Sequence, residues 1–356
     1  MRTFAPVPPS LLAVAEAQEG LLSAEQCESH GVGSSRRSRL VRSSHWRAVT
    51  RGVVDTIPVA PRERTPADIP SRPAVTLARR GEATRPRSLT AWRTARRSRS
   101  DADLVYDHRR RRAAWTGLLA HGPESIAVGT SALALHGVEG LPASLVPEVA
   151  LPHGARRPHR PGIRLRQFDD GMTAVPFVDP RTGARRIASV PWALAQAVPE
   201  LPCGNGLAVL DSALRLELVD RPGLVAAHDH ARGRRGVAAR HVLWGWADPR
   251  AESPLESFGR WQCIELGVPP DVLQHPILAD GRVLGIADMV WRRRGGRLLV
   301  VEMDGLAWHE GGPDGGRRDR DRDNAFAQVA GVDVLRFDAR HVRDGVVGQR
   351  VRAFLD

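Results

Sequence analysis

Three carboxylates near the carboxyl end of the sequence have the types and spacing of a metal site. Asp288 lies inside the apolar run Ile286–Val290, and Glu302 follows the run Leu298–Val301. An unpartnered buried carboxylate is costly, so each is expected to have a partner. Because strand side chains alternate between faces, Glu302 and Asp304 point to the same side. If the strand of Asp288 pairs alongside, the three carboxylates converge on a site suited to Mg²⁺.

Nearby residues could complete phosphodiester hydrolysis at that ion. His309 is the candidate for proton transfer, because an imidazole titrates near neutrality. Arg318 or Arg320 is the candidate cation facing the phosphate, since the sequence contains no lysine and all 52 basic residues are arginine. The structural alternatives are that His309 is a loop histidine and that the aspartates following Arg318 form ion pairs along a helix.

The elements that must position these residues follow from caps, turns and apolar runs. Ser253 with Pro254 and Glu256 predicts the start of a helix that ends near Leu266. Glu256 is interpreted as its cap, with a metal-site role as the alternative. The further expected elements are strands 273–278, 284–291 and 297–303, a helix over 318–330, a strand over 332–337 and a helix over 341–354. This αβββαβα order is that of the restriction-endonuclease fold.

Residues 252–355 resemble a family of nucleases. Asp288 followed by Glu302-Met303-Asp304 is similar to the PD-(D/E)xK motif. The run Asp304-Gly305-Leu306-Ala307-Trp308-His309 resembles the His-Gly-x-x-Trp-His run of very-short-patch-repair endonucleases, except at its first position. The resemblance implies a Mg²⁺-dependent endonuclease with Asp288, Glu302, Asp304, His309 and Arg320 at its site. Asp304 stands where the motif has lysine, and the alternative is a nuclease fold that has lost catalysis.

The amino-terminal 60 residues have the pattern of a winged helix-turn-helix. A helix over 11–17, a second helix capped by Ser23 and Gln26, a third from Ser34 or Ser35, and a strand or hairpin over 46–54 are expected. The run from Gly31 to Val54 has no acidic residue. In that fold the second helix of the motif lies in the major groove and a wing contacts the backbone. The expected DNA-binding residues are Arg36, Arg37, Arg39, Arg42 and Arg51; a protein-docking role is the alternative.

The same region resembles AbiEi-type abortive-infection antitoxins. The similarity runs from Leu21 to Val54 and includes Trp46–Val53. Residues 113–250, with alternating helices and short strands, resemble the second domain of such chains at 132–137 and 211–215, but depart from it at 187–190. The resemblance implies a regulator that binds the DNA of its own operon. Within this middle region, His228-Asp229-His230 is interpreted as a solvated turn rather than a metal pair.

Composition separates a strongly basic stretch from the rest. Residues 61–112 hold 15 arginines against 6 acidic residues, a local charge of +9 within a net charge of +12. Their Pro, Ser, Thr and Arg content predicts a linker that is either inert or attracts phosphate backbones. The three cysteines are far apart, which argues against a disulfide framework. No membrane span and no signal peptide are expected, so a cytoplasmic location is predicted.

The sequence thus predicts an α/β multidomain protein. It would comprise a winged helix-turn-helix (1–60), an Arg/Pro/Ser-rich linker (61–112), an α/β middle domain (113–250) and an αβββαβ endonuclease-like domain (251–356). The predicted function is a DNA-binding protein with a Mg²⁺-dependent endonuclease domain, acting in phage defence or DNA repair. The alternative is a non-enzymatic repressor or antitoxin of a type IV toxin-antitoxin system with an inactive nuclease fold. A toxin or defence-system partner is an open expectation.

Overall fold

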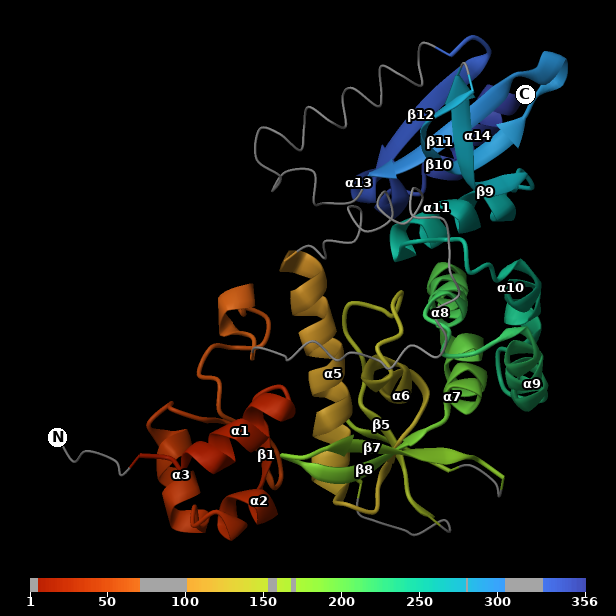
Figure 1. Ribbon diagram of the computed structural model, residues 1–356. Coiled ribbons are helices and arrows are strands. Elements are labelled where there is room, and N and C mark those ends of the chain that lie inside the picture. Colours follow the sequence, from red (N-terminus) through yellow and green to blue (C-terminus); the bar gives the residue numbers. More distant parts are fainter. Residues whose placement is uncertain (1–5, 71–100, 153–158, 168–170, 280, 305–328) are drawn as a thin grey trace. The chain divides into compact units, whose positions relative to one another are not determined.

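The computed structural model is a mixed α/β protein with several sheets, as the coarse fold class predicted (Figure 1). It describes residues 6–70, 101–152, 159–167, 171–279, 281–304 and 329–356. The chain divides into two compact units, residues 1–136 with 143–193 and residues 137–142 with 194–356. In the described part of the chain, no helix combines the length and the apolar character that crossing a membrane requires.

The amino-terminal elements form a small three-stranded sheet with three helices around it. Ser23 caps the second helix as predicted, with Gln26 completing the capping box. The third helix is capped by Gly33 rather than by a serine side chain. The sheet order is β1-β3-β2, and Leu22 of β1 is buried in one core with Trp46, which precedes β2. The elements are α1 (Pro9–Ala17), β1 (Leu21–Ser23), α2 (Ala24–Ser29), α3 (Ser34–Arg42), β2 (Arg47–Thr50) and β3 (Val53–Asp55).

The rest of the first unit is built around a five-stranded sheet and one long helix, α5 (Asp101–His121). The sheet order is β6-β5-β4-β8-β7, and α5 packs against β4 and β5 with Trp115 fully buried. The linker expected over 61–112 is therefore wrong for its last part, since residues 101–112 are helical. The other elements are η1 (Pro66–Asp68), β4 (Ile126–Ala127), α6 (Gly129–Leu135), β5 (Glu148–Ala150), β6 (Arg164–Arg166), β7 (Ala174–Asp179) and β8 (Gly183–Ala188).

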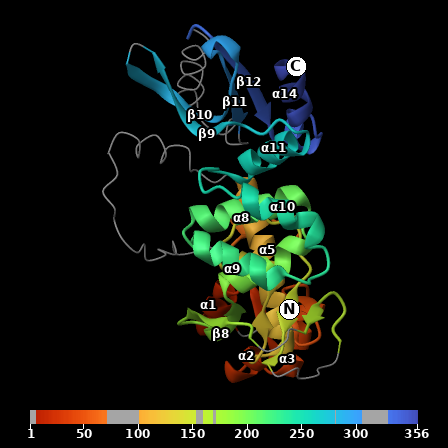
Figure 2. The ribbon, with the colours of Figure 1, turned by 90° about the vertical axis from the view of Figure 1, so that its right-hand side faces the viewer.

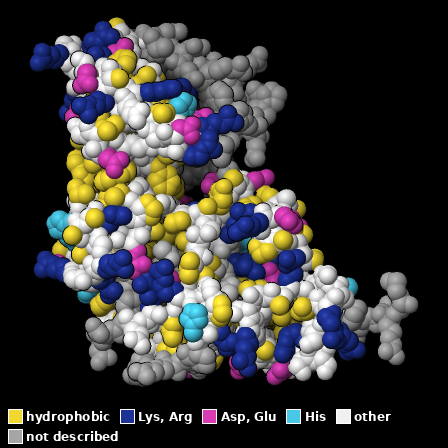
Figure 3. Space-filling view, turned by 180° about the vertical axis from the view of Figure 1, so that it is seen from behind, with side chains coloured by type: hydrophobic (Ala, Val, Ile, Leu, Met, Phe, Trp, Pro, Cys, Tyr) yellow, Lys and Arg dark blue, Asp and Glu magenta, His cyan; other side chains and the backbone are white. Residues whose placement is uncertain are grey.

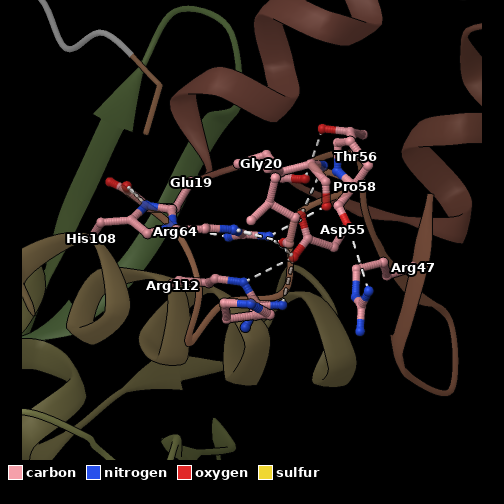
Figure 4. A network of polar contacts seen from close by, with 12 residues as sticks. Glu19, Gly20, Arg47, Asp55, Thr56, Pro58, Arg64, His108 and Arg112 are labelled. Carbon is pink, nitrogen blue, oxygen red and sulfur yellow. Dashed lines mark hydrogen bonds and ion pairs between the residues drawn. The ribbon is translucent and has the colours of Figure 1, made fainter. Parts of the chain in front are cut away.

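A buried polar network joins α5 to the amino-terminal sheet (Figure 4). Asp55, at the end of β3, accepts hydrogen bonds from Arg64 and Arg112. Glu19 accepts from Arg111 and contacts His108. Such ion pairs are costly to bury, and removing one partner leaves a stranded charge. Residues three and four positions apart lie on one face of a helix, so the helical geometry of α5 lets His108, Arg111 and Arg112 reach inward together.

The second unit begins with helices. His228, Asp229 and His230 lie in α9, so the interpretation of these residues as a turn is wrong; Asp220 caps this helix and Pro222 occupies its first turn. Arg260 of helix α11 (Pro254–Glu265) forms a buried ion pair with Asp211 of helix α8 (Cys203–Arg215). The elements of this part are α7 (Val190–Ala197), η3 (Val198–Glu200), α8 (Cys203–Arg215), α9 (Arg221–Ala231), η4 (Ala238–Arg240) and α10 (His241–Trp246).

The carboxyl-terminal part is a four-stranded sheet with helices packed on one of its faces (Figure 2). The order is β12-β11-β10-β9, with β11 and β12 parallel and the other pairs antiparallel. Cys263 and Val351 bring α11 and α14 onto a core that includes Leu299 and Phe337. The elements are α11 (Pro254–Glu265), β9 (Val272–Ala279), β10 (Arg282–Arg292), η5 (Arg294–Gly296), β11 (Leu298–Asp304), β12 (Val332–Asp338), α13 (Ala339–Arg343) and α14 (Val347–Leu355).

The carboxyl-terminal end of the chain differs from the sequence expectation. The single closing helix over 341–354 is wrong: Asp338 caps a short α13, and Gly345, with φ of +71°, separates it from α14. A residue in the left-handed region interrupts helical hydrogen bonding. The helix expected over 318–330 lies almost entirely outside the described residues.

Candidate functional site

Asp288 and Glu302 lie on neighbouring strands of the carboxyl-terminal sheet. Met289 pairs with Val301 and Val290 with Val300, and continuing this register by one residue sets Asp288 opposite Glu302. Opposed residues of an antiparallel pair project to the same face. Both side chains are buried, with 1% and 0% of their surface exposed. The sheet therefore brings together two of the carboxylates that the sequence identified.

Asp288 is held by N–H donors from both neighbouring strands. Its Oδ2 accepts the backbone N–H of Met303 at 2.8 Å, and its Oδ1 accepts from Nε2 of Gln274 at 3.3 Å. The ladder of β10 and β11 ends at the pair of Met289 with Val301, so the Asp288 carboxylate accepts a backbone N–H just beyond that end. This arrangement fixes the orientation of the Asp288 carboxylate.

Gln274 connects this aspartate to a second acidic side chain. The same Nε2 donates to Oε2 of Glu256 at 3.0 Å. Gln274 also has a φ of +53°, which is uncommon for a residue with a side chain and marks local backbone strain. No signal in the sequence points to Gln274, because its place beside Asp288 depends on the register of β9 with β10, which shifts between Val283 and Gly285.

Glu256 acts as part of the amino-terminal cap of α11, as predicted. Ser253 accepts the Glu256 N–H at 3.2 Å and its hydroxyl donates to Oε1 of Glu256 at 2.9 Å. The backbone N–H of Glu252 donates to Oε2 at 2.9 Å. Glu256 is buried, so the cap also carries a carboxylate toward Gln274 and Asp288.

Asp304 ends β11 beside an arginine of the next strand. Arg336 of β12 is the register partner of Glu302, and its Nη1 lies 3.4 Å from both carboxylate oxygens of Asp304. In the part of the chain that the structure describes, no group of three or more His, Cys, Asp or Glu side chains is placed to hold a metal ion. The predicted site residues His309, Arg318 and Arg320 lie outside the described residues.

The predicted DNA-binding arginines fall into two sets. Arg36 donates to the carbonyl of Pro6 at 2.9 Å, and Arg37 contacts Ala24 and Glu28, so both are half-buried against their own domain. Arg39 and Arg42 are exposed and line a shallow hollow with three serines of α3. Arg51 is exposed in the turn between β2 and β3. The exposed set is the one available to a ligand.

Comparison with known proteins gives relatives without an assigned activity. The chain is 35% identical over 158 residues to two uncharacterized proteins of Mycobacterium tuberculosis, one from strain CDC 1551 / Oshkosh and one from strain ATCC 25618 / H37Rv. The match covers 42% of this chain and 55% of each relative, so the chain spans about half the length of these curated relatives. No protein-family model matches the chain.

Proposed function

We propose that this protein binds DNA through its amino-terminal part and cleaves phosphodiester bonds with a metal-dependent site in its carboxyl-terminal part. The observation that carries the proposal is the buried pair Asp288 and Glu302, opposed on β10 and β11, with Gln274 joining Asp288 to Glu256. The sheet, with helices α11 and α14 on one face, supports assignment to the restriction-endonuclease fold.

The chemistry of the pair favours a hard divalent cation. Opposed residues have their Cβ atoms about 4.5 to 5.5 Å apart, so two ionised carboxylates there would repel each other. Mg²⁺ is bound by one or two carboxylates together with waters and substrate phosphates. Asp288 and Glu302 would hold it, with Asp304 and Glu256 as neighbouring acids. When bound, such an ion stabilises charge on a phosphoryl oxygen and lowers the pKa of a bound water.

The residues of this chain would orient the substrate around that pair. The backbone N–H of Met303 and the side chain of Gln274 keep the Asp288 carboxylate in one orientation. Arg336, beside Asp304 and opposite Glu302, supplies a permanent positive charge on the strand next to the acids. A guanidinium at this position could bind a substrate phosphate, and it would supply the positive charge that the lysine of the motif provides.

The amino-terminal elements support a winged helix as the DNA-binding part. Their order is helix, strand, helix, helix and hairpin, and α3 carries four arginines without an acidic residue. Arg39 and Arg42 would contact the major groove or its phosphates, and Arg51 would reach the backbone from the β2–β3 turn. The net charge of −2 over residues 251–356 fits this division, because DNA must be held elsewhere in the chain.

Nicking of supercoiled plasmid tests the proposal. The full chain is incubated with Mg²⁺, with Mn²⁺ or with EDTA, beside Asp288→Asn, Glu302→Gln and the control Asp333→Asn. The control changes a half-buried aspartate of β12 that is paired with Arg293 and Arg297. We expect metal-dependent nicking by the wild type and the control, and its loss in both site variants. Calorimetric titration with Mn²⁺ should show the same pattern. Equal background nicking by all four proteins would contradict the proposal that this protein cleaves DNA.

A repressor with an inactive nuclease fold is the second candidate. Asp304 occupies the motif's lysine position and lies against Arg336, which favours a structural use of that carboxylate. Tight, salt-dependent DNA binding without nicking in any metal would support this candidate. A toxin or defence-system partner belongs to the same proposal, and co-expression of the genes beside this one would test for it.

A further inference from the structure

A groove between α9 and α10 exposes apolar side chains that the proposed function does not use. Arg221, Leu224, Val225 and His228 line it from α9, at the spacing of one helix face. Val242, Trp244 and Trp246 are among the residues that line it from α10. Val225 is 62% exposed, Val242 49% and Trp246 37%. Figure 3 shows hydrophobic side chains exposed among arginines and histidines on the face seen from behind. Exposed apolar surface of this kind marks an interaction site.

The floor and one wall of the groove are ordered by aromatic contacts. The His228 ring stacks on Trp244 with centroids 5.0 Å apart and an interplanar angle of 22°. Nε2 of His228 lies 2.9 Å from Nδ1 of His241, which joins the two helices. Leu224 and Trp244 are buried beneath the exposed valines. Rigid aromatic groups of this kind lose little entropy when a partner binds.

The charges at the groove select the partner's chemistry. No Asp or Glu is among the described residues that line it. Arg221 is exposed, and it makes no hydrogen bond or ion pair with any residue that the structure describes. Asp229 of the same helix is paired with Arg232. The open cation at the edge therefore favours a carboxylate of the partner.

A second copy of this chain fits the groove poorly. A twofold interface sets the same patch of both subunits against itself. The groove would then oppose Arg221 of each copy to its own equivalent, and like charges across an interface are unfavourable. The apolar side chains that α9 and α10 expose along this groove instead resemble the grooves that receive a single helix with apolar residues at i, i+3, i+4 and i+7.

We propose that the α9–α10 groove is a docking site for an amphipathic helix of a partner protein, with apolar anchors on one face and acidic residues beside them. The apolar anchors would cover Val225, Val242 and Trp246, and a carboxylate would pair with Arg221. The proposal is independent of the nuclease and DNA-binding assignments, because the groove shares no residue with either site.

Selection from a phage-displayed library of short helical peptides on the full chain tests this site. We expect enriched sequences to carry apolar residues at helical spacing with flanking Asp or Glu. Their affinity should fall at least about tenfold for Val225→Glu and Val242→Glu, and should remain unchanged for the control Val178→Glu, an exposed valine of β7. For Arg221→Glu, a version of the peptide with Lys in place of its acids should bind better than the original.

Four outcomes overturn the proposal. No enrichment above background contradicts a helix-docking site, and so does enrichment that survives both valine substitutions. A concentration-dependent dimer in light scattering that Val225→Glu disperses identifies a second copy as the occupant. Displacement of the bound peptide by a short DNA duplex, with the same sensitivity to Val225→Glu, identifies nucleic acid instead. Circular dichroism of each variant confirms that the fold is retained.

Discussion

Arg64 donates a hydrogen bond to Nε2 of His108 at 2.9 Å, and both side chains are buried. A guanidinium can only donate, so this ring nitrogen must be the acceptor and the Nδ1 proton must point to Glu19, 2.7 Å away. The histidine is therefore neutral and its tautomer is set by its neighbours. Residues from the turn between α1 and β1, the loop after β3 and α5 thus depend on one another for their polar contacts (Figure 4).

Removing Arg64 should destabilise the protein strongly. Arg64→Met takes one cation from the buried carboxylate of Asp55 and the donor from His108. Breaking a buried pair costs about 3 to 5 kcal/mol, because the other charge stays buried. Urea unfolding monitored by circular dichroism measures the loss. Arg232→Ala, which changes a largely exposed arginine, is the control and should alter the free energy of unfolding little. Equal effects of the two substitutions would contradict the role given to the network.

The exposed arginines of α3 should contribute more to DNA binding than the half-buried ones. Arg39→Ala and Arg42→Ala should each weaken duplex binding at all sequences and reduce the slope of log K against log salt by about 1, as expected for a phosphate contact. Arg37→Ala should instead lower stability, because Arg37 contacts Ala24 and Glu28. Fluorescence anisotropy over a salt series measures the slopes. An unchanged slope in both exposed variants would move DNA binding away from α3.

Gln274 should act as a positioning residue for the carboxylates. In Gln274→Ala the link between Glu256 and Asp288 is lost, and in Gln274→Glu a third acid replaces a neutral donor. We expect both variants to weaken Mn²⁺ binding in calorimetry. In the Ala variant the Asp288 carboxylate would lose its fixed orientation, and in the Glu variant the dependence of Mn²⁺ affinity on pH would change. Gln274→Asn keeps the amide on a side chain that is one methylene shorter, so it tests whether the length of the side chain matters. If the wild type binds Mn²⁺ and all three variants bind it equally, Gln274 has no positioning role.

Two of the three thiols should be inert in the native protein. Burial raises the pKa of Cys27 to about 11 and that of Cys263 to about 12, so at about pH 8 almost none of either is the reactive thiolate. Cys203 is only partly buried. Ellman's reagent should therefore titrate one thiol rapidly in buffer and three in denaturant. As the pH rises toward those pKa values, the reaction of Cys27 and Cys263 with the reagent should accelerate. Rapid labelling of a second thiol near neutrality would contradict this.

Gly348 should not tolerate a methyl group. A Cβ at this position of α14 would lie 2.3 Å from the Gln262 carbonyl oxygen of α11, a backbone atom. Alanine usually stabilises a helix interior by about 1 kcal/mol over glycine, but the clash should reverse the sign and destabilise by about 1 to 3 kcal/mol. Gly245→Ala of α10, where nothing lies within 4 Å, is the matched control and should be neutral or stabilising. Thermal unfolding compares the two.

Local signals in the sequence predicted most of the helices and strands. Ser23 and Ser253 cap the helices that they were expected to cap, and apolar runs over 273–278, 284–291 and 332–337 became strands. These features depend on neighbouring residues, so the sequence contains them directly. One error arose where tertiary contacts overrode composition: arginines 109–112 suggested a linker, but α5 carries Arg111 and Arg112 inward to Glu19 and Asp55.

The sequence by itself determined that Asp288 and Glu302 would sit in apolar strands, because alternation and burial follow from residue order. Only the tertiary structure decided which side chains meet them. Gln274 reaches Asp288 through the bulged register of β9 with β10, and Glu256 arrives from the cap of α11. Glu19 and His108 are 89 residues apart in the chain and share a hydrogen bond. Such contacts depend on how packed elements are placed, and residue spacing along a chain carries no measure of that.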